Sequence, residues 1–227
     1  MGNGTVSFVQ VWNEAYDRAW LVETLRSMLN LAQSLSVTPD SLHQRLAQNA
    51  IHDPSPGVRL QNLRFLADPS TLSPEPLLAT TGQALLEDPN PRVRLLAAQL
   101  AGARGHAALA ALAAAQQLEL GLRVAAVTAL GRPPVPALGA LRALLALATP
   151  PELLCEALSV VGQRGLKPLA DAALGCVASE HETVRAAAAN ALAALAYREA
   201  EPELIALLSD ASAEVQQKSA EALGALR

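Results

Sequence analysis

The chain has 227 residues, of which 51% are hydrophobic but only 3% are aromatic, so alanine and leucine supply most of its apolar surface. This composition favours helix, and the length suffices for one large domain or two small ones. The net charge of -4 leaves no basic footprint, which argues against nucleic acid as a partner. No apolar stretch reaches the roughly 18 residues that would span a bilayer, so we expect no membrane insertion.

The first 37 residues do not repeat, and we expect them to be helical. Phe8, Trp12, Tyr16 and Trp20 lie four residues apart, which places them on one slowly winding helix face. Charged residues interrupt the apolar positions, so the segment does not read as a signal peptide. Two interpretations stay open. The segment is either a cap that seals the first repeat or a docking or dimerising helix led by the two tryptophans.

From about Thr38 onward, a ten-residue phrase recurs six times, at start-to-start intervals of 35, 29, 31, 31 and 31 residues. A fixed period in this range is typical of stacked supersecondary units, each of which needs its neighbours to complete a core. Apolar or small residues usually occupy positions one, five, eight and nine of the phrase, which is helical spacing. The phrases begin at Val58, Val93, Leu122, Leu153, Val184 and Val215.

A second amphipathic run lies before each phrase, so we expect pairs of helices in which helix A is followed by helix B, the phrase itself. All 15 prolines fall outside the phrases, as expected of a residue that breaks helix interiors but is tolerated in a first turn. Thr38 suits the N-cap of the earliest helix A, and Pro39 suits its first position. The later A helices are expected within 74–87, 106–117, 135–148, 168–178 and 202–209.

The phrases resemble HEAT repeats, in particular the short HEAT-like kind found in phycobilisome lyases. The family phrase opens with Val-Arg after an acidic loop, as residues 88–94 do here, and closes with Ala-Leu-Gly, as at Gly131 and Gly224. The resemblance implies an all-α fold: a right-handed α-α superhelix, or HEAT-like solenoid, of about six helix pairs over residues 38–227, with B helices lining the concave face. Residues 1–37 would form the non-repeat helical cap or docking segment.

Arginine occupies the second position of four phrases, at Arg59, Arg94, Arg123 and Arg185. A functional interpretation is an arginine ladder that binds a phosphate or carboxylate ligand. In the structural interpretation, which we prefer, each arginine bonds to the acidic loop before it. Such pairing is architectural in the family that the phrases resemble.

Positions three, four and seven of each phrase should face outward, and these are the variable surface positions of the family. The third position is mostly apolar and the seventh mostly polar, which predicts an apolar stripe beside a polar one on the concave face. A contiguous exposed apolar strip usually marks a binding surface, whereas the alternative is scattered exposed residues or cover by the N-terminal segment. The candidate partner-binding residues are Leu60, Arg64, Leu95, Gln99, Val124, Thr128, Ser159 and Asn190.

No arrangement of residues predicts an enzyme, a cofactor or a metal. HEAT hydroxylases that bind iron use several His-Glu pairs, and the single pair His181-Glu182 cannot complete that site. Cys155 and Cys176 match no zinc spacing, so we expect reduced thiols in a reducing, cytoplasmic compartment. The acidic balance also disfavours a HEAT-like DNA glycosylase, which needs a cationic groove.

We therefore expect a non-enzymatic scaffold or adaptor that binds another protein through the concave face of the solenoid. The alternative is an accessory subunit of an enzyme, such as a bilin-lyase-like or chromophore-handling protein. The repeat type and composition are compatible with a bacterial origin, and the chain could form a homo-oligomer or belong to a larger parent chain. Fold class does not itself name the partner.

Overall fold

The computed structural model describes residues 39–132, 136–146 and 149–226, and all regular secondary structure in these ranges is helical. The chain divides into two compact units, residues 1–78 and 79–227, each of which is described by itself. The predicted boundary between residues 37 and 38 lies at the edge of the described residues, so that division of the chain stays a prediction. The predicted N-cap Thr38 also lies outside the described residues.

Unit 1 is built around one helix pair. Helix α2 (Pro39–His52) packs against α3 (Pro56–Ala67), followed by the short 3-10 helix η1 (Pro69–Thr71) and the first residues of α4 (Glu75–Ala84). The buried His43 ring bonds through Nε2 to the carbonyl oxygen of Thr71 at 3.0 Å, which fixes η1 against α2. The apolar core of this pair consists of Ala47, Ala50, Leu63, Phe65 and Leu66.

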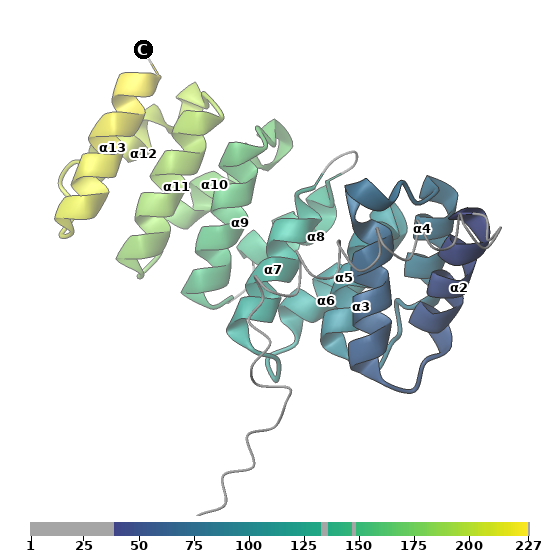
Figure 1. Cartoon of the computed structure of the whole chain (residues 1–227). Coiled ribbons are helices and arrows are strands. Elements are labelled where there is room, and N and C mark those ends of the chain that lie inside the picture. The colour runs from purple at the N-terminus through teal and green to yellow at the C-terminus, as the bar shows by residue number, and fades with distance from the viewer. Residues whose placement is uncertain (1–38, 133–135, 147–148, 227) are drawn as a thin grey trace, which may run out of the picture. The chain divides into compact units, whose positions relative to one another are not determined.

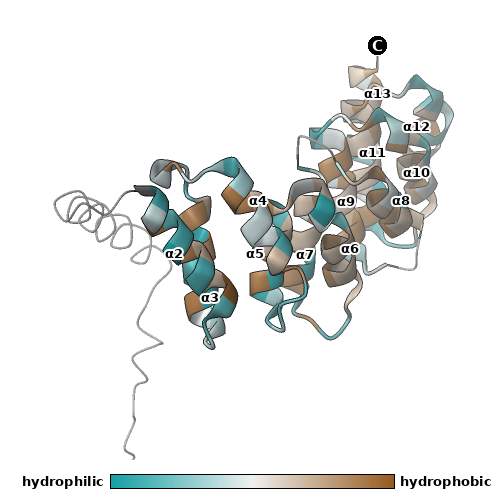
Figure 2. Cartoon of the chain, turned by 90° about the vertical axis from the view of Figure 1, so that its right-hand side faces the viewer, coloured by the Kyte–Doolittle hydropathy of each residue, from teal (hydrophilic) through white to brown (hydrophobic). Residues whose placement is uncertain are grey.

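Unit 2 holds two rows of helices (Figure 1). The B helices α5, α7, α9, α11 and α13 each contact the next one along the chain, and the A helices α6, α8, α10 and α12 form a second layer against them (Figure 2). The B helices span Pro91–Leu100, Leu120–Leu130, Pro151–Gln163, Glu182–Ala194 and Ala213–Ala225. The A helices span His106–Ala114, Leu138–Ala146, Ala170–Gly175 and Glu201–Leu207, with 3-10 helices at Gly102–Gly105, Lys167–Leu169, Cys176–Ala178 and Arg198–Ala200.

The predicted helix pairs are confirmed. Every phrase forms a B helix, and each run expected as helix A coincides with a helix before its phrase, although α12 begins at Glu201, one residue before the expected run. Within the described ranges the pairs are α2/α3, α4/α5, α6/α7, α8/α9, α10/α11 and α12/α13, which matches the expected six. The fold class is therefore the all-α solenoid that the period and the proline positions indicate.

The core of unit 2 is wider than the phrase pattern predicts, because the sixth position is buried as well. Ala98, Val127, Leu158 and Ala189 are each 0% exposed. Each B helix packs both on A helices and on neighbouring B helices, so a second side of the helix is removed from water. Alanine occupies this position in α5 and α11, and the larger Val127 and Leu158 occupy it in α7 and α9. Conversely, the first-position Val58 in unit 1 is exposed at 37%.

The turns after α9 and α11 are left-handed and closed by the same backbone bond, but only the turn after α9 has glycine at the left-handed position. Gly165 follows α9 at φ 61°, with the Leu166 N–H donating to Val161 O at 3.0 Å. Ala196 follows α11 at φ 53°, with the Tyr197 N–H donating to Leu192 O at 3.1 Å. This is the usual C-terminal cap of a helix, in which glycine escapes the strain that a Cβ atom brings.

We expect Ala196→Gly to raise the free energy of unfolding by about 0.5 to 1 kcal/mol, because relief of left-handed strain outweighs the added freedom of the unfolded chain. Gly165→Ala should lower it by about 1 kcal/mol, since open space surrounds the position and only backbone strain is added. Thermal unfolding of both variants beside the wild type checks the opposite signs. Shifts of the same sign would contradict the cap assignment.

Candidate functional site

The second-position arginines are bound to the backbone of the loop before each B helix. The Nη1 atoms of Arg59, Arg94 and Arg185 donate to the carbonyl oxygens of Asp53, Asp88 and Ser179 at 2.8, 2.6 and 2.8 Å. Each arginine also reaches the next carbonyl along the loop, at 3.1 to 3.2 Å. The geometry thus supports the structural interpretation of these arginines, with backbone carbonyls of the preceding loop as acceptors.

The acidic residues of these loops have a separate local role. The Oδ1 atoms of Asp53, Asp88 and Asp210 each accept the backbone N–H two residues later at 2.8 Å. Such turns bend the chain into the following helix. Arg123 departs from the pattern, because its Nε donates to the carbonyl of Ala113 at 2.9 Å and its side chain is buried.

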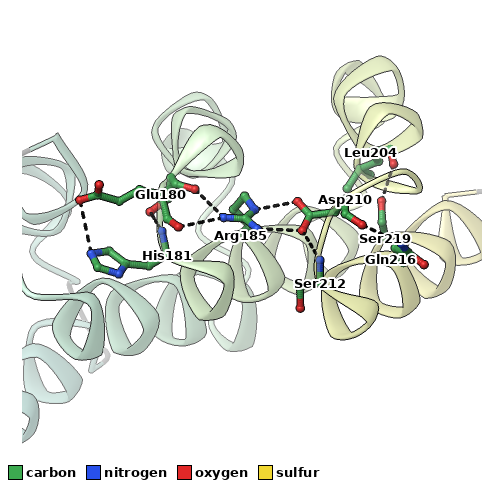
Figure 3. A network of polar contacts seen from close by, with 9 residues as sticks. Glu180, His181, Arg185, Leu204, Asp210, Ser212, Gln216 and Ser219 are labelled. Atoms are coloured by element: carbon green, nitrogen blue, oxygen red, sulfur yellow. Dashed lines mark hydrogen bonds and ion pairs between the residues drawn. The ribbon is translucent and has the colours of Figure 1, made fainter.

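Arg185 additionally joins two successive helix pairs (Figure 3). Its Nε and Nη2 donate to the two carboxylate oxygens of Asp210, both at 2.8 Å, and the two side chains are only 16% and 9% exposed. The Arg185 guanidinium, helped by the Ser212 N–H, holds the pKa of Asp210 below its ordinary value. The same bonds raise the pKa of Arg185. This bidentate ion pair links α11 to the loop before α13.

The predicted binding residues of unit 2 lie on a row of B helices that we call the B face: the third and seventh phrase positions of α5, α7, α9 and α11. At the seventh position Gln99, Thr128 and Ser159 are half-buried and Asn190 is exposed. At the third position Leu95 and Val124 are half-buried and pack against the core. The polar side chains of the seventh position therefore make up more of the solvent-exposed surface of the B face than the sequence pattern predicts.

Hydrogen bonds link the polar residues of the B face to its surroundings. The Thr128 hydroxyl donates to Glu156 Oε1 on the next B helix at 2.5 Å, and Gln163 Nε2 donates to the Ser159 hydroxyl at 2.8 Å. Arg132 Nη1 donates to Gln99 Oε1 at 3.4 Å. Sequence reasoning missed Glu156 as a member of the face, although its fourth phrase position indicated an outward direction.

The remaining predicted site residues belong to unit 1 or lie outside the described residues. Leu60 is half-buried and Arg64 exposed on α3, which belongs to unit 1. Phe8, Trp12, Tyr16 and Trp20 lie outside the described residues, so both interpretations of that segment stay predictions. The B face is therefore defined by unit 2 alone.

The described residues of unit 2 offer little support for a ligand pocket, a reactive thiol or a metal site. A hollow of about 230 Å³ beside the N-termini of α5 and α7 contains the exposed pair Arg92–Glu119, whose charged atoms lie 3.4 Å apart. Cys155 and Cys176 are free thiols, and burial raises the pKa of both. Among the described residues no group of three or more His, Cys, Asp or Glu side chains could hold a metal ion. In the same part of the chain no helix is long and apolar enough to cross a membrane.

Comparison with known proteins agrees with the stacked pairs. Residues 166–227 match the family model described as HEAT repeats. The matched segment, rather more than a quarter of the chain, carries HEAT repeats. This confirms the recognition made from the phrases, while the phycobilisome-lyase kind stays a prediction. No curated protein matches the sequence.

Solved helical-repeat and engineered proteins are similar to this chain at low sequence identity. An engineered protein has a TM-score of 0.52 and 18% identity, covering 81% of this chain and 96% of its own. A designed armadillo repeat protein has a TM-score of 0.48 and 20% sequence identity, and the match covers 81% of this chain and 99% of that protein. Human deoxyhypusine hydroxylase in complex with glycerol has a TM-score of 0.47 and 16% sequence identity, and the match covers 86% of this chain and 98% of that protein. The likeness to the first shows the fold alone, and those to the other two carry no argument.

Proposed function

We propose that the chain is a non-enzymatic scaffold that binds another protein through the B face of its HEAT repeats. A HEAT or armadillo-like scaffold fits a protein-binding role. The observation that carries the proposal is the seventh-position row: Gln99, Thr128, Ser159 and Asn190 stay accessible on four successive B helices while the neighbouring sixth position is buried throughout.

The chemistry of this row favours a polypeptide partner. Its amide and hydroxyl groups can each donate and accept hydrogen bonds without carrying charge, so they suit peptide groups better than phosphates. Packed helices lie about 8 to 10 Å apart, which is about three residues of extended chain at 3.3 to 3.6 Å per residue. A partner laid across the B helices would meet one polar side chain about every third residue.

The half-buried Leu95 and Val124 would supply the apolar part of the contact. Because they also pack against the core, substitution at Leu95 or Val124 would alter folding and binding together. Ser159 and Asn190 are better test positions, since Asn190 is exposed and the side chain of Ser159 bonds, among the described residues, to the exposed Gln163.

We expect the double variant Ser159→Arg/Asn190→Arg to lose at least about tenfold in affinity for a protein captured from extract of the source cell, because two bulky cations would block the row. The matched control is Ala111→Arg/Ala143→Arg, which adds the same charge at exposed positions of the A helices α6 and α8. Binding is measured by titration of the captured protein, and circular dichroism confirms helicity. Equal binding by both variants would remove the B face from the proposal.

The non-enzymatic part of the proposal has its own test. A purified protein that is coloured, or that retains stoichiometric metal, would instead support the chromophore-handling or accessory-subunit alternative. Absorption spectroscopy and elemental analysis of the purified chain measure both properties directly.

A further inference from the structure

One charged side chain lies in the otherwise uncharged B face. The third, fourth and seventh phrase positions of α5, α7, α9 and α11 hold uncharged residues everywhere except at Glu156, the fourth position of α9. The same position is Leu96 in α5, Ala125 in α7 and Ala187 in α11. The charge of Glu156 is therefore a local departure from the repeat, and packing does not require it, since the other B helices pack with an apolar residue there.

The Glu156 carboxylate is held in place by the neighbouring B helix. The Thr128 hydroxyl of α7 donates to its Oε1 at 2.5 Å, a length typical of a bond between a hydroxyl and an ionised carboxylate. Glu156 is half-buried, so its charge is partly shielded from water. The bond from Thr128 orients the side chain across the space between two helices and engages only one of its two oxygens.

No cation of the described residues pairs with this carboxylate. The ion pairs within the described ranges involve other acids, among them Glu119, Asp210 and Glu221. The Oε2 atom of Glu156 accepts no hydrogen bond from a described residue, and it is not sealed from water. This second oxygen is therefore open to a donor that comes from outside the chain.

Helix electrostatics explain the neighbouring acid but not Glu156. Glu152 lies in the first turn of α9, where the free amide groups of the helix N-terminus stabilise a negative charge. Glu156 lies one turn further on, beyond the reach of that effect, and two like charges four residues apart repel each other. The bond from Thr128 needs no charge either, because glutamine offers the same oxygen acceptor. A cation from a bound partner would stabilise both carboxylates.

We infer that the protein bound to the B face places a lysine or arginine side chain on Glu156, in a segment that crosses α9. The inference rests on the proposed function and adds the charge of the partner to it. The uncharged seventh-position row binds the backbone of that segment, while Glu156 selects the side chain beside it. Such charge pairing selects partners more than it adds affinity, because an acidic segment at the same place is repelled.

Synthetic peptides of glycine and serine with one central lysine test the inference. They are about twelve residues long, because about three extended residues cover each of the four B helices. A second peptide carries acetyllysine, which lacks the charge, and an arginine and citrulline pair covers the other cation. NMR titration of the isotope-labelled 227-residue chain measures each affinity. We expect the cationic peptides to shift the amide resonances around Thr128 and Glu156 and to bind about threefold more tightly than their neutral counterparts.

Glu156→Gln removes the charge and keeps an oxygen for the Thr128 hydroxyl. This variant should bind the cationic peptides about threefold more weakly and the neutral peptides as the wild type does, and its melting temperature should not fall. The effects of removing the two charges should coincide rather than multiply, since each removes the same pair. The matched control is Glu201→Gln, which removes a carboxylate at an exposed position of the A helix α12 and should leave every affinity unchanged.

Failure of this inference differs from failure of the proposed function. The inference is wrong if Glu156→Gln leaves the affinity for the cationic peptides unchanged, if Glu201→Gln weakens binding equally, or if neither cationic peptide shifts a resonance at millimolar concentration. The proposed function survives each of these results as long as Ser159→Arg/Asn190→Arg still loses the protein captured from cell extract. Equal capture by that double variant and its control removes the B face, and the role of Glu156 with it.

Discussion

Gly105→Ala is expected to lower the free energy of unfolding by about 3 kcal/mol, at the upper end of what overpacking costs. Gly105 precedes α6 with ordinary helical angles, φ -80° and ψ -11°, so its backbone does not require glycine. The added Cβ atom, however, would lie 2.0 Å from the carbonyl oxygen and 2.6 Å from the carbonyl carbon of Ala98 in α5. Because backbone atoms cannot swing aside as a side chain can, α5 and α6 would have to separate.

Thermal unfolding measures this effect, and about 3 kcal/mol corresponds to a melting temperature lower by roughly 6 to 12 °C for a chain of this size. The control is Gly121→Ala in the first turn of α7, where nothing lies within 4 Å of the added atom. That variant should be as stable as the wild type or slightly more stable, since alanine favours helix over glycine. Equal melting temperatures for the two variants would show that α5 and α6 are not held in close contact.

Asp210→Ala is expected to lower the free energy of unfolding by about 2 kcal/mol at neutral pH, because it removes two charge-assisted bonds and leaves the mostly buried Arg185 without its carboxylate. It also removes the acceptor for the Ser212 N–H. The exposed Glu221, which pairs with Lys218, is the control. Glu221→Ala should have little effect, since exposed ion pairs contribute little.

The pH dependence of Asp210→Ala has a definite sign. Arg185 lowers the pKa of Asp210 in the folded state, so the unfolded chain takes up the proton first as the pH falls. The contribution of the carboxylate is therefore complete above its ordinary pKa and disappears as the pH falls through the lowered value. Denaturant unfolding at neutral and acidic pH should show the gap between wild type and variant narrowing in acid. A gap that stays constant or widens would contradict the ion pair.

Much of the fold follows from the sequence because a solenoid repeats one structural unit, and the repeat appears in the sequence as a regular spacing of similar residues. The phrase starting at Val93 and its counterparts at Leu153 and Val184 set the B helices, and prolines such as Pro91 and Pro151 stand at first turns, where the structure places them. The second-position arginines were also interpretable, since a fixed spacing to the preceding loop indicates a repeated local bond.

Other features depend on contacts that no periodicity reports. The burial of Ala98 and Ala189 depends on which helices pack against α5 and α11, and small residues look the same in sequence whether or not a neighbour covers them. The half-burial of Leu95 has the same origin, so the apolar stripe is less accessible than its residue types indicated. The division at residue 78 and the exposure of Ile205 likewise depend on which elements lie beside one another in space.

The sequence pattern predicted which phrase positions form the candidate face, but not how exposed or how polar that face is. The third and seventh phrase positions were selected from helical spacing and the family resemblance; in the structure Asn190 is exposed, whereas Gln99, Thr128 and Ser159 are half-buried. The bond between Thr128 and Glu156 joins residues on successive B helices, 28 positions apart. Such a pair appears only once the distance between those helices is known.

Site-specific photo-crosslinking in the source cell tests the central claim, that the B face binds another protein. A crosslinking amino acid is placed at Asn190 on α11 in one experiment and at the exposed Ala143 of the A helix α8 in another. We predict that Asn190 yields a discrete crosslinked product with a second polypeptide, absent from Ala143. The same product from both positions, or from Ala143 alone, would contradict it.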